Sequence, residues 1–138
     1  MKTATLKLPS GAYLLYLNGE SHFRLIDAFG SAYGETLFPD PMPADTAGTR
    51  DYVDHLLQAA AILSEQGEMV RRYLGYEAQP YLTDADMAGL WLILTPELLG
   101  KVASAVSAAI ALGFDQSFTS SEDVDIGLLE LEKKTPGQ

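Results

Sequence analysis

The stretch from Thr83 to Gly113, TDADMAGLWLILTPELLGKVASAVSAAIALG, constrains the fold of this chain more than any other. It predicts two strongly apolar helices that meet at Thr95-Pro96. Thr83 is a good helix N-cap, and the acidic residues that follow it suit the positive end of a helix. Thr95 caps the second helix in the same way, and proline is favoured at the first helical position after it. Gly113 is suited to end that helix.

Large apolar residues cover more than one face of the first of these helices, and five stand in a row from Leu90 to Leu94. Helical spacing predicts one buried stripe, which the remaining apolar residues widen. The stripe consists of Met87, Leu90, Trp91 and Leu94, and the residues that widen it are Leu92 and Ile93. A helix that is apolar nearly all round lies centrally in a core or also faces a partner. Both interpretations stay open, and the candidate partner-binding residues are Leu90, Trp91, Leu94, Leu98 and Val102.

The start of the chain predicts a β-hairpin. Thr3–Leu8 and Ala12–Leu17 are β-prone, and Pro9-Ser10-Gly11 between them has turn chemistry. Asn18-Gly19 supplies a second turn signal. The next segment has two interpretations, a third strand or a short helix, at His22–Ile26 or Ser21–Phe29 respectively. We favour a strand followed by a helical turn.

Residues 31–48 are expected to form an irregular loop rich in proline and glycine. Prolines at positions 39, 41 and 43 exclude a regular helix and a central strand between Gly30 and Gly48. Two interpretations remain for this loop. It is either a solvated connector or, from Leu37 to Met42, an apolar arm that docks on a neighbouring subunit or partner.

A long helix is expected after the loop. Apolar residues fall on one face at helical spacing, in a pattern that begins at Thr49 or Asp51 and ends near Leu74. Gly67 weakens the middle of this helix and can break it into two pieces. Gly75 is suited to end it.

Together these segments predict a mainly α fold of the α+β class, with a small N-terminal β-hairpin or meander followed by a bundle of three to four helices. The 138-residue chain is long enough for one hydrophobic core. We expect a single globular domain over residues 1–114, with a β-rich start at 1–30, the loop at 31–48 and the helices at 49–114. Residues 115–138 are expected to form an acidic, partly flexible C-terminal tail.

Composition bears on the kind of partner. The net charge is −10 and only nine residues are Lys or Arg, which opposes nucleic-acid binding because phosphate contacts depend on clustered cations. No apolar run reaches the roughly 18 uninterrupted residues expected of a membrane span. The absence of cysteine excludes a disulfide framework and makes a cytoplasmic location the expectation. The acidity suits a basic protein partner.

The residues that most often carry catalysis or bind metals are sparse. Asp51 and His55 are spaced to share a metal on a helix, but a useful site needs three or four ligands and the sequence offers no third. No serine stands in a nucleophile elbow, and the glycines form no phosphate-binding loop. We therefore expect no enzyme activity, no cofactor and no metal.

Several segments then follow one another in a recognisable order. A β start with a glycine turn leads to a short apolar segment, a long helix, a P-x-L-T-x-x-D lead-in and a final helix that ends in LGF. These segments are Leu14–Gly19, Phe23–Gly30, Leu56–Ala61, Pro80–Asp86 and Pro96–Phe114. This layout resembles the small tail assembly chaperones of long-tailed bacteriophages and prophages.

The resemblance implies a non-enzymatic protein that holds the tape measure protein in soluble form and recruits tail tube subunits. It further implies self-association, action in the cytoplasm of the bacterial host, and a longer product made by ribosomal frameshifting near Glu132-Lys133-Lys134. Two alternatives from other classes remain. One is a structural tail or head-completion component of the phage particle, and the other is a small hydrolytic enzyme that uses His55.

Overall fold

The computed structural model describes residues 2–114. The predicted acidic tail at 115–138 lies outside the described residues. Within them the chain forms two strands followed by five helices: β1 (Thr3–Leu8), β2 (Gly11–Tyr16), α1 (Gly19–Phe29), α2 (Tyr33–Leu37), α3 (Thr46–Tyr73), α4 (Asp84–Ile93) and α5 (Pro96–Phe114). The predicted α+β class, a hairpin followed by helices, is confirmed.

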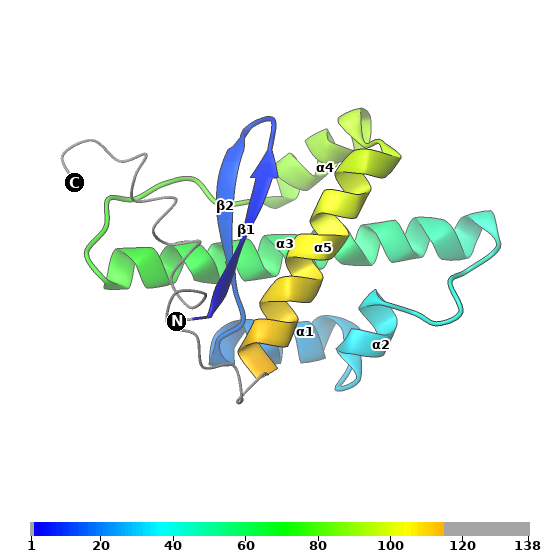
Figure 1. The fold of residues 1–138 in the computed structure, drawn as a ribbon, viewed down its shortest axis with the longest axis horizontal. Coiled ribbons are helices and arrows are strands. Elements are labelled where there is room, and N and C mark those ends of the chain that lie inside the picture. Colours follow the sequence, from blue (N-terminus) through cyan, green and yellow to red (C-terminus); the bar gives the residue numbers. More distant parts are fainter. Residues whose placement is uncertain (1, 115–138) are drawn as a thin grey trace.

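The long helix α3 spans the molecule, and the other elements pack around it (Figure 1). The hairpin lies between α3 and α5, with β2 against α3 and β1 against α5. Helices α1 and α2 contact α3 from below in Figure 1, and α4 contacts it from above, near the hairpin turn. One apolar core draws side chains from every element, including Leu6, Leu15, Leu25, Leu37, Leu56, Leu90 and Val102.

The β-hairpin is confirmed almost as predicted. The strands pair antiparallel from Thr3 with Tyr16 to Leu8 with Gly11, which leaves Pro9 and Ser10 as a two-residue loop. Proline cannot donate a ladder hydrogen bond, so the loop is a position that tolerates it.

The expected third strand is wrong, because α1 occupies Gly19–Phe29. Asn18 does not turn a hairpin here but caps this helix. The Ser21 N–H donates to Asn18 Oδ1 at 2.8 Å, and the Asn18 N–H donates to Ser21 Oγ at 2.9 Å. This reciprocal capping box satisfies backbone donors at the helix start, and asparagine supports it as readily as it supports a turn.

Helix α3 is longer than predicted and unbroken. Its 28 residues begin at Thr46, inside the expected loop, and continue through Gly67. Gly67 is buried against β2, where a Cβ atom would lie only 1.9 Å from the carbonyl oxygen of Leu14. Glycine therefore serves as the contact point between helix and strand. Gly75 ends the helix with φ of 95° as predicted, and the Tyr76 N–H donates to the Arg71 carbonyl at 3.0 Å.

The expected loop at 31–48 also contains the short helix α2, which corrects the exclusion of helix from this segment. The helix ends at Leu37, before the first of the three prolines, so no proline interrupts its hydrogen bonds. Tyr33 and Leu37 are buried in the core. The interpretation of Leu37–Met42 as an apolar docking arm is therefore wrong for Leu37, while Met42 is exposed.

Helix α5 is the most apolar long helix of the described chain. By length and composition it is the one described helix that could cross a membrane. Its buried residues Leu98, Val102, Ala105, Val106 and Ala109 form one face, which packs on β1 and α3. Small residues, including Ser104, Ser107, Ala108 and Ala111, occupy the exposed face. Packing against the hairpin accounts for the large apolar residues of the buried face.

Candidate partner-binding surface

Helix α4 is the element on which the exposed apolar surface is built, and local hydrogen bonds fix where it begins. The Thr83 N–H donates to Asp86 Oδ2 at 2.8 Å, and the Asp86 N–H donates to Thr83 Oγ1 at 3.4 Å. This capping box confirms the predicted role of Thr83. One residue earlier, the Leu82 N–H donates to the buried hydroxyl of Ser64 on α3 at 3.0 Å.

A buried polar cluster on α3 holds the segment that leads into α4. Glu68 Oε1 accepts from Arg71 Nη1 and Glu68 Oε2 accepts from Arg72 Nε, both at 2.9 Å. The Gln79 N–H also donates to Glu68 Oε2, at 2.7 Å. Arg71 reaches the carbonyl of Glu77 at 3.1 Å. The lead-in is thus tied to α3 by side-chain contacts instead of secondary structure.

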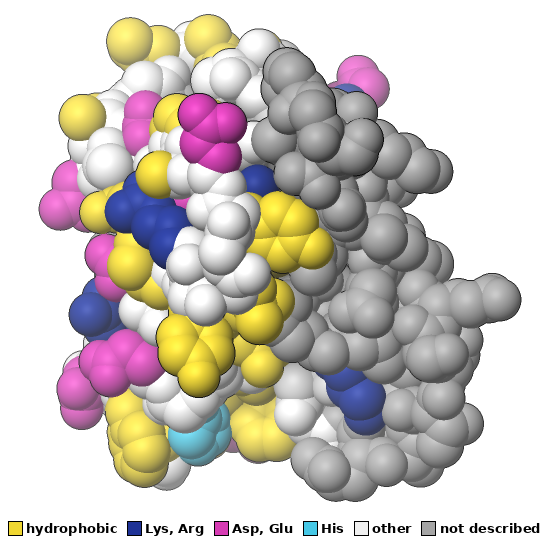
Figure 2. All heavy atoms as spheres, turned by 90° about the vertical axis from the view of Figure 1, so that its left-hand side faces the viewer, with side chains coloured by type: hydrophobic (Ala, Val, Ile, Leu, Met, Phe, Trp, Pro, Cys, Tyr) yellow, Lys and Arg dark blue, Asp and Glu magenta, His cyan; other side chains and the backbone are white. Residues whose placement is uncertain are grey.

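This cluster lies toward the C-terminal end of α3, on the side of the molecule that faces the viewer in Figure 2. Basic, acidic and apolar side chains are interspersed there. The Arg71 guanidinium lies 5.4 Å from the centre of the Tyr76 ring, and that of Arg72 lies 5.9 Å from the Tyr81 ring. These cation–π contacts add to the hydrogen bonds that hold the lead-in.

The five candidate residues named from the sequence do not form one open surface. Leu90, Leu98 and Val102 are buried in the core, so they act through packing. Trp91 and Leu94 are half-buried and pack against that core. Of the six apolar residues assigned to α4, the two that widen the stripe are the exposed ones: Leu92 is 89% exposed and Ile93 49%.

Trp91 faces the start of α3 and not the solvent-exposed side of α4. The Arg50 guanidinium carbon lies 5.3 Å from the centre of the Trp91 ring. Such a cation–π contact is worth about 0.5–1 kcal/mol at a partly exposed site. Trp91 therefore joins α4 to α3.

We expect Trp91→Ala to lower the free energy of unfolding by about 2 kcal/mol, less than for a fully buried tryptophan because the ring is half-buried. Arg50→Ala is the matched control, since it removes only the cation–π partner and should lower stability by at most about 1 kcal/mol. Urea denaturation followed by circular dichroism measures both. Unchanged stability of Trp91→Ala together with lost partner binding would instead make Trp91 a docking residue.

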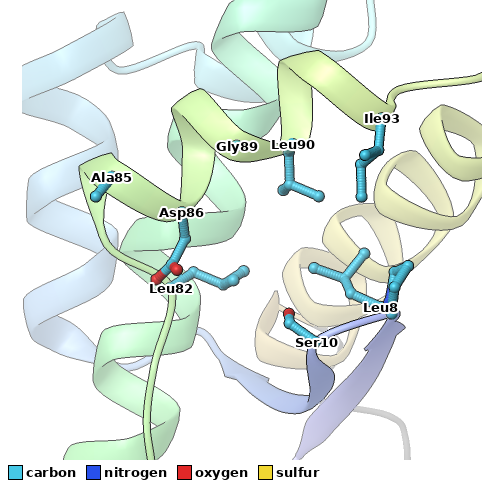
Figure 3. Close-up of a pocket in the computed structure, with 9 residues that line it drawn as sticks. Leu8, Ser10, Leu82, Ala85, Asp86, Gly89, Leu90 and Ile93 are labelled. Atoms are coloured by element: carbon cyan, nitrogen blue, oxygen red, sulfur yellow. The ribbon is translucent and has the colours of Figure 1, made fainter.

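Beside the exposed residues of α4 lies an open groove of about 420 Å³. One wall is the hairpin turn and the other is α4. The lining residues are Leu8, Pro9, Ser10, Leu82, Ala85, Asp86, Gly89, Leu90 and Ile93. Figure 3 shows Leu90 and Ile93 pointing from α4 toward Leu8 on β1. The groove is mostly apolar, and its one charged lining group is Asp86.

The two histidines lie in aromatic contacts. His55 packs edge-on against Phe29, with ring centroids 5.2 Å apart. His22 Nδ1 and the Tyr33 hydroxyl are 2.7 Å apart in a hydrogen bond, and burial raises the pKa of Tyr33 above its ordinary value. No group of three His, Asp or Glu side chains that could hold a metal occurs within residues 2–114. The structure therefore adds no third ligand to Asp51 and His55.

The sequence identifies α4 as strongly apolar but does not show which of its large residues are exposed. Leu92 and Ile93 lie off the predicted stripe, which is the sequence signal for their exposure. Three of the five candidate residues, Leu90, Trp91 and Leu94, belong to the stripe itself. Comparisons with known proteins add no relative: no protein-family model, no curated protein and no solved structure matches this chain.

Proposed function

We propose that this protein is a non-enzymatic tail assembly chaperone of a phage or prophage that binds the tape measure protein through α4. The observation that supports it best is the pairing of exposed Leu92 and Ile93 with the adjacent apolar groove. Large apolar side chains beside a groove suit an amphipathic helix. The segments Pro80–Asp86 and Pro96–Phe114, which carry the resemblance to these chaperones, build and flank this surface.

The chemistry of the surface fits holding a partner in solution. An apolar patch provides contact, and a chain with net charge −10 keeps the complex dispersed by repulsion. In this proposal tail tube subunits are further partners, the protein self-associates, and the complex forms in the bacterial cytoplasm.

Coexpression with the tape measure protein encoded nearby tests the proposal. We expect the two proteins to co-purify, and we expect Leu92→Glu to reduce the recovered complex at least about ten-fold, because a charge would enter the apolar contact. Leu92 is 89% exposed, so the substitution should leave the fold intact. Tyr73→Glu is the control, since Tyr73 is equally exposed at the end of α3.

Two results would contradict the proposal. Failure of the unmodified pair to co-purify counts against tape measure binding, and an equal loss with both variants counts against α4 as the surface. Presence of the protein in purified virions would favour the alternative, a structural tail or head-completion component.

A further inference from the structure

The groove between α4 and the hairpin turn has a chemistry that narrows its occupant. Resting on the function proposed above, we infer that it binds a cationic amphipathic helix that inserts apolar side chains over Gly89 and places basic residues beside Asp84 and Asp86. Three features favour this class of partner segment: the shape of the groove, Gly89 and the local charge.

Three parts of the chain contribute apolar side chains to the groove. Leu8 comes from β1, Leu82 from the segment before α4, and Leu90 and Ile93 from α4 itself (Figure 3). Leu92 extends the apolar surface beyond the groove. The volume of about 420 Å³ accommodates side chains of a docked segment without displacing the core. Aliphatic anchors in a cleft are typical of helix-in-groove recognition.

Gly89 is the glycine among the residues that line the groove. Glycine weakens a helix interior relative to alanine, so its presence in the middle of α4 calls for a reason. At Gly67 that reason is the backbone of β2, but a Cβ atom at Gly89 would meet nothing within 4 Å. Gly89 lines the groove, so the missing side chain leaves the α4 backbone open to close approach by another chain.

The acidic charge around the groove favours a positively charged partner segment. Asp86 lines the groove and Asp84 stands beside it in the first turn of α4, whereas Arg50 and Arg72 contact the rings of Trp91 and Tyr81. Complementary charge steers a basic segment to such a surface and disfavours an acidic one. The chain's own apolar segment Ile126–Leu131 is flanked by acids and has the wrong sign.

Synthetic peptides of about 18 residues, five helical turns, test the inference on the full-length protein. One peptide has a leucine face and a lysine face, the second replaces every lysine with glutamate, and the third is a shuffled form of the first with no apolar face. Fluorescence anisotropy should show the first peptide binding at least about ten-fold more tightly than either of the others. Its affinity should fall as salt is added.

A pair of glycine variants locates the binding site. Gly89→Leu fills the groove and should weaken binding of the basic peptide at least about ten-fold. Gly100→Leu is the matched control, because Gly100 is also an exposed helical glycine with open space around it, and it should bind normally. Circular dichroism establishes that both variants remain folded.

Equal binding of the basic and shuffled peptides would reduce the effect to general charge attraction and overturn the inference. Unchanged affinity of Gly89→Leu would overturn it as well. If the basic peptide fails to bind while the tape measure protein still co-purifies, the inference fails and the proposed function stands. If the peptide binds at Gly89 but the tape measure protein does not co-purify, only the proposed function fails.

Discussion

Gly67→Ala is expected to lower the free energy of unfolding by about 3 kcal/mol or more, the largest effect expected of a glycine-to-alanine substitution within residues 2–114. The new Cβ atom would stand 1.9 Å from the Leu14 carbonyl oxygen and 2.7 Å from its carbonyl carbon. Both atoms belong to the backbone of β2, so no side-chain rotation relieves the clash. Helix and strand must separate, which opens the densely packed core between them.

Gly89→Ala provides the matched control. It makes the same chemical change in the interior of a helix, at a position where the added Cβ meets nothing within 4 Å. Helix propensity alone then applies, and stability should rise by up to about 1 kcal/mol. Urea denaturation of both variants measures the difference. If Gly67→Ala proves as stable as the parent, the close approach of α3 and β2 is wrong.

Gly67 also illustrates why part of the fold could be predicted and part could not. The hairpin, the caps at Thr83 and Thr95 and the stop at Gly75 depend on residues close in sequence, and each is confirmed. The role of Gly67 depends on a strand more than fifty positions away in the chain. Local propensity identifies such a glycine only as a weak point in a helix.

Asn18 shows a second limit of prediction from sequence, because two local signals compete at this residue. Asparagine followed by glycine suits a tight turn, and asparagine three residues before a serine suits a helix cap. Both signals are present, and the structure uses the second. The long-range bond from Asn18 Nδ2 to Gln66 Oε1 on α3, 3.1 Å, further stabilises the capped arrangement. Local sequence patterns cannot predict that bond, because its two residues lie far apart in the chain.

The candidate site shows a third limit. Periodicity identifies the buried face of a helix only when polar residues mark the other faces. Leu90 to Leu94 gives no such contrast, so the sequence puts Leu92 off the buried stripe but could not show that Leu92 is exposed instead of packed in a wider core. The hairpin turn that forms the second wall of the groove lies more than seventy positions earlier in the chain.

Glu68→Ala is expected to lower the free energy of unfolding by about 3–5 kcal/mol, because it leaves the charge of Arg71 buried without its counter-ion. Glu68 is 4% exposed and Arg71 only 1%. Within residues 2–114, Arg71 Nε and Nη2 already have no hydrogen-bond partner. After the substitution, the Glu77 carbonyl is the remaining hydrogen-bond acceptor that the described residues offer its guanidinium.

The same substitution should also loosen the attachment of α4. Glu68 accepts the Gln79 N–H and holds Arg72, whose Nη2 donates to the Gln79 carbonyl at 3.2 Å. Without Glu68, the segment between α3 and α4 loses its main anchor, and the amide of Gln79 should exchange hydrogen faster. Because this segment positions α4, binding at the groove should weaken along with stability.

Glu65→Ala is the matched control for Glu68→Ala, because it also removes a carboxylate from an ion pair on α3, but that pair is not buried. Glu65 is also on α3 and pairs with Arg24, but both side chains are partly exposed, so its loss should cost at most about 1 kcal/mol. Urea denaturation compares the two variants, and hydrogen exchange follows the amide of Gln79. Equal destabilisation by the two substitutions, or unchanged exchange at Gln79 in Glu68→Ala, would show that the buried cluster does not hold the segment that carries α4.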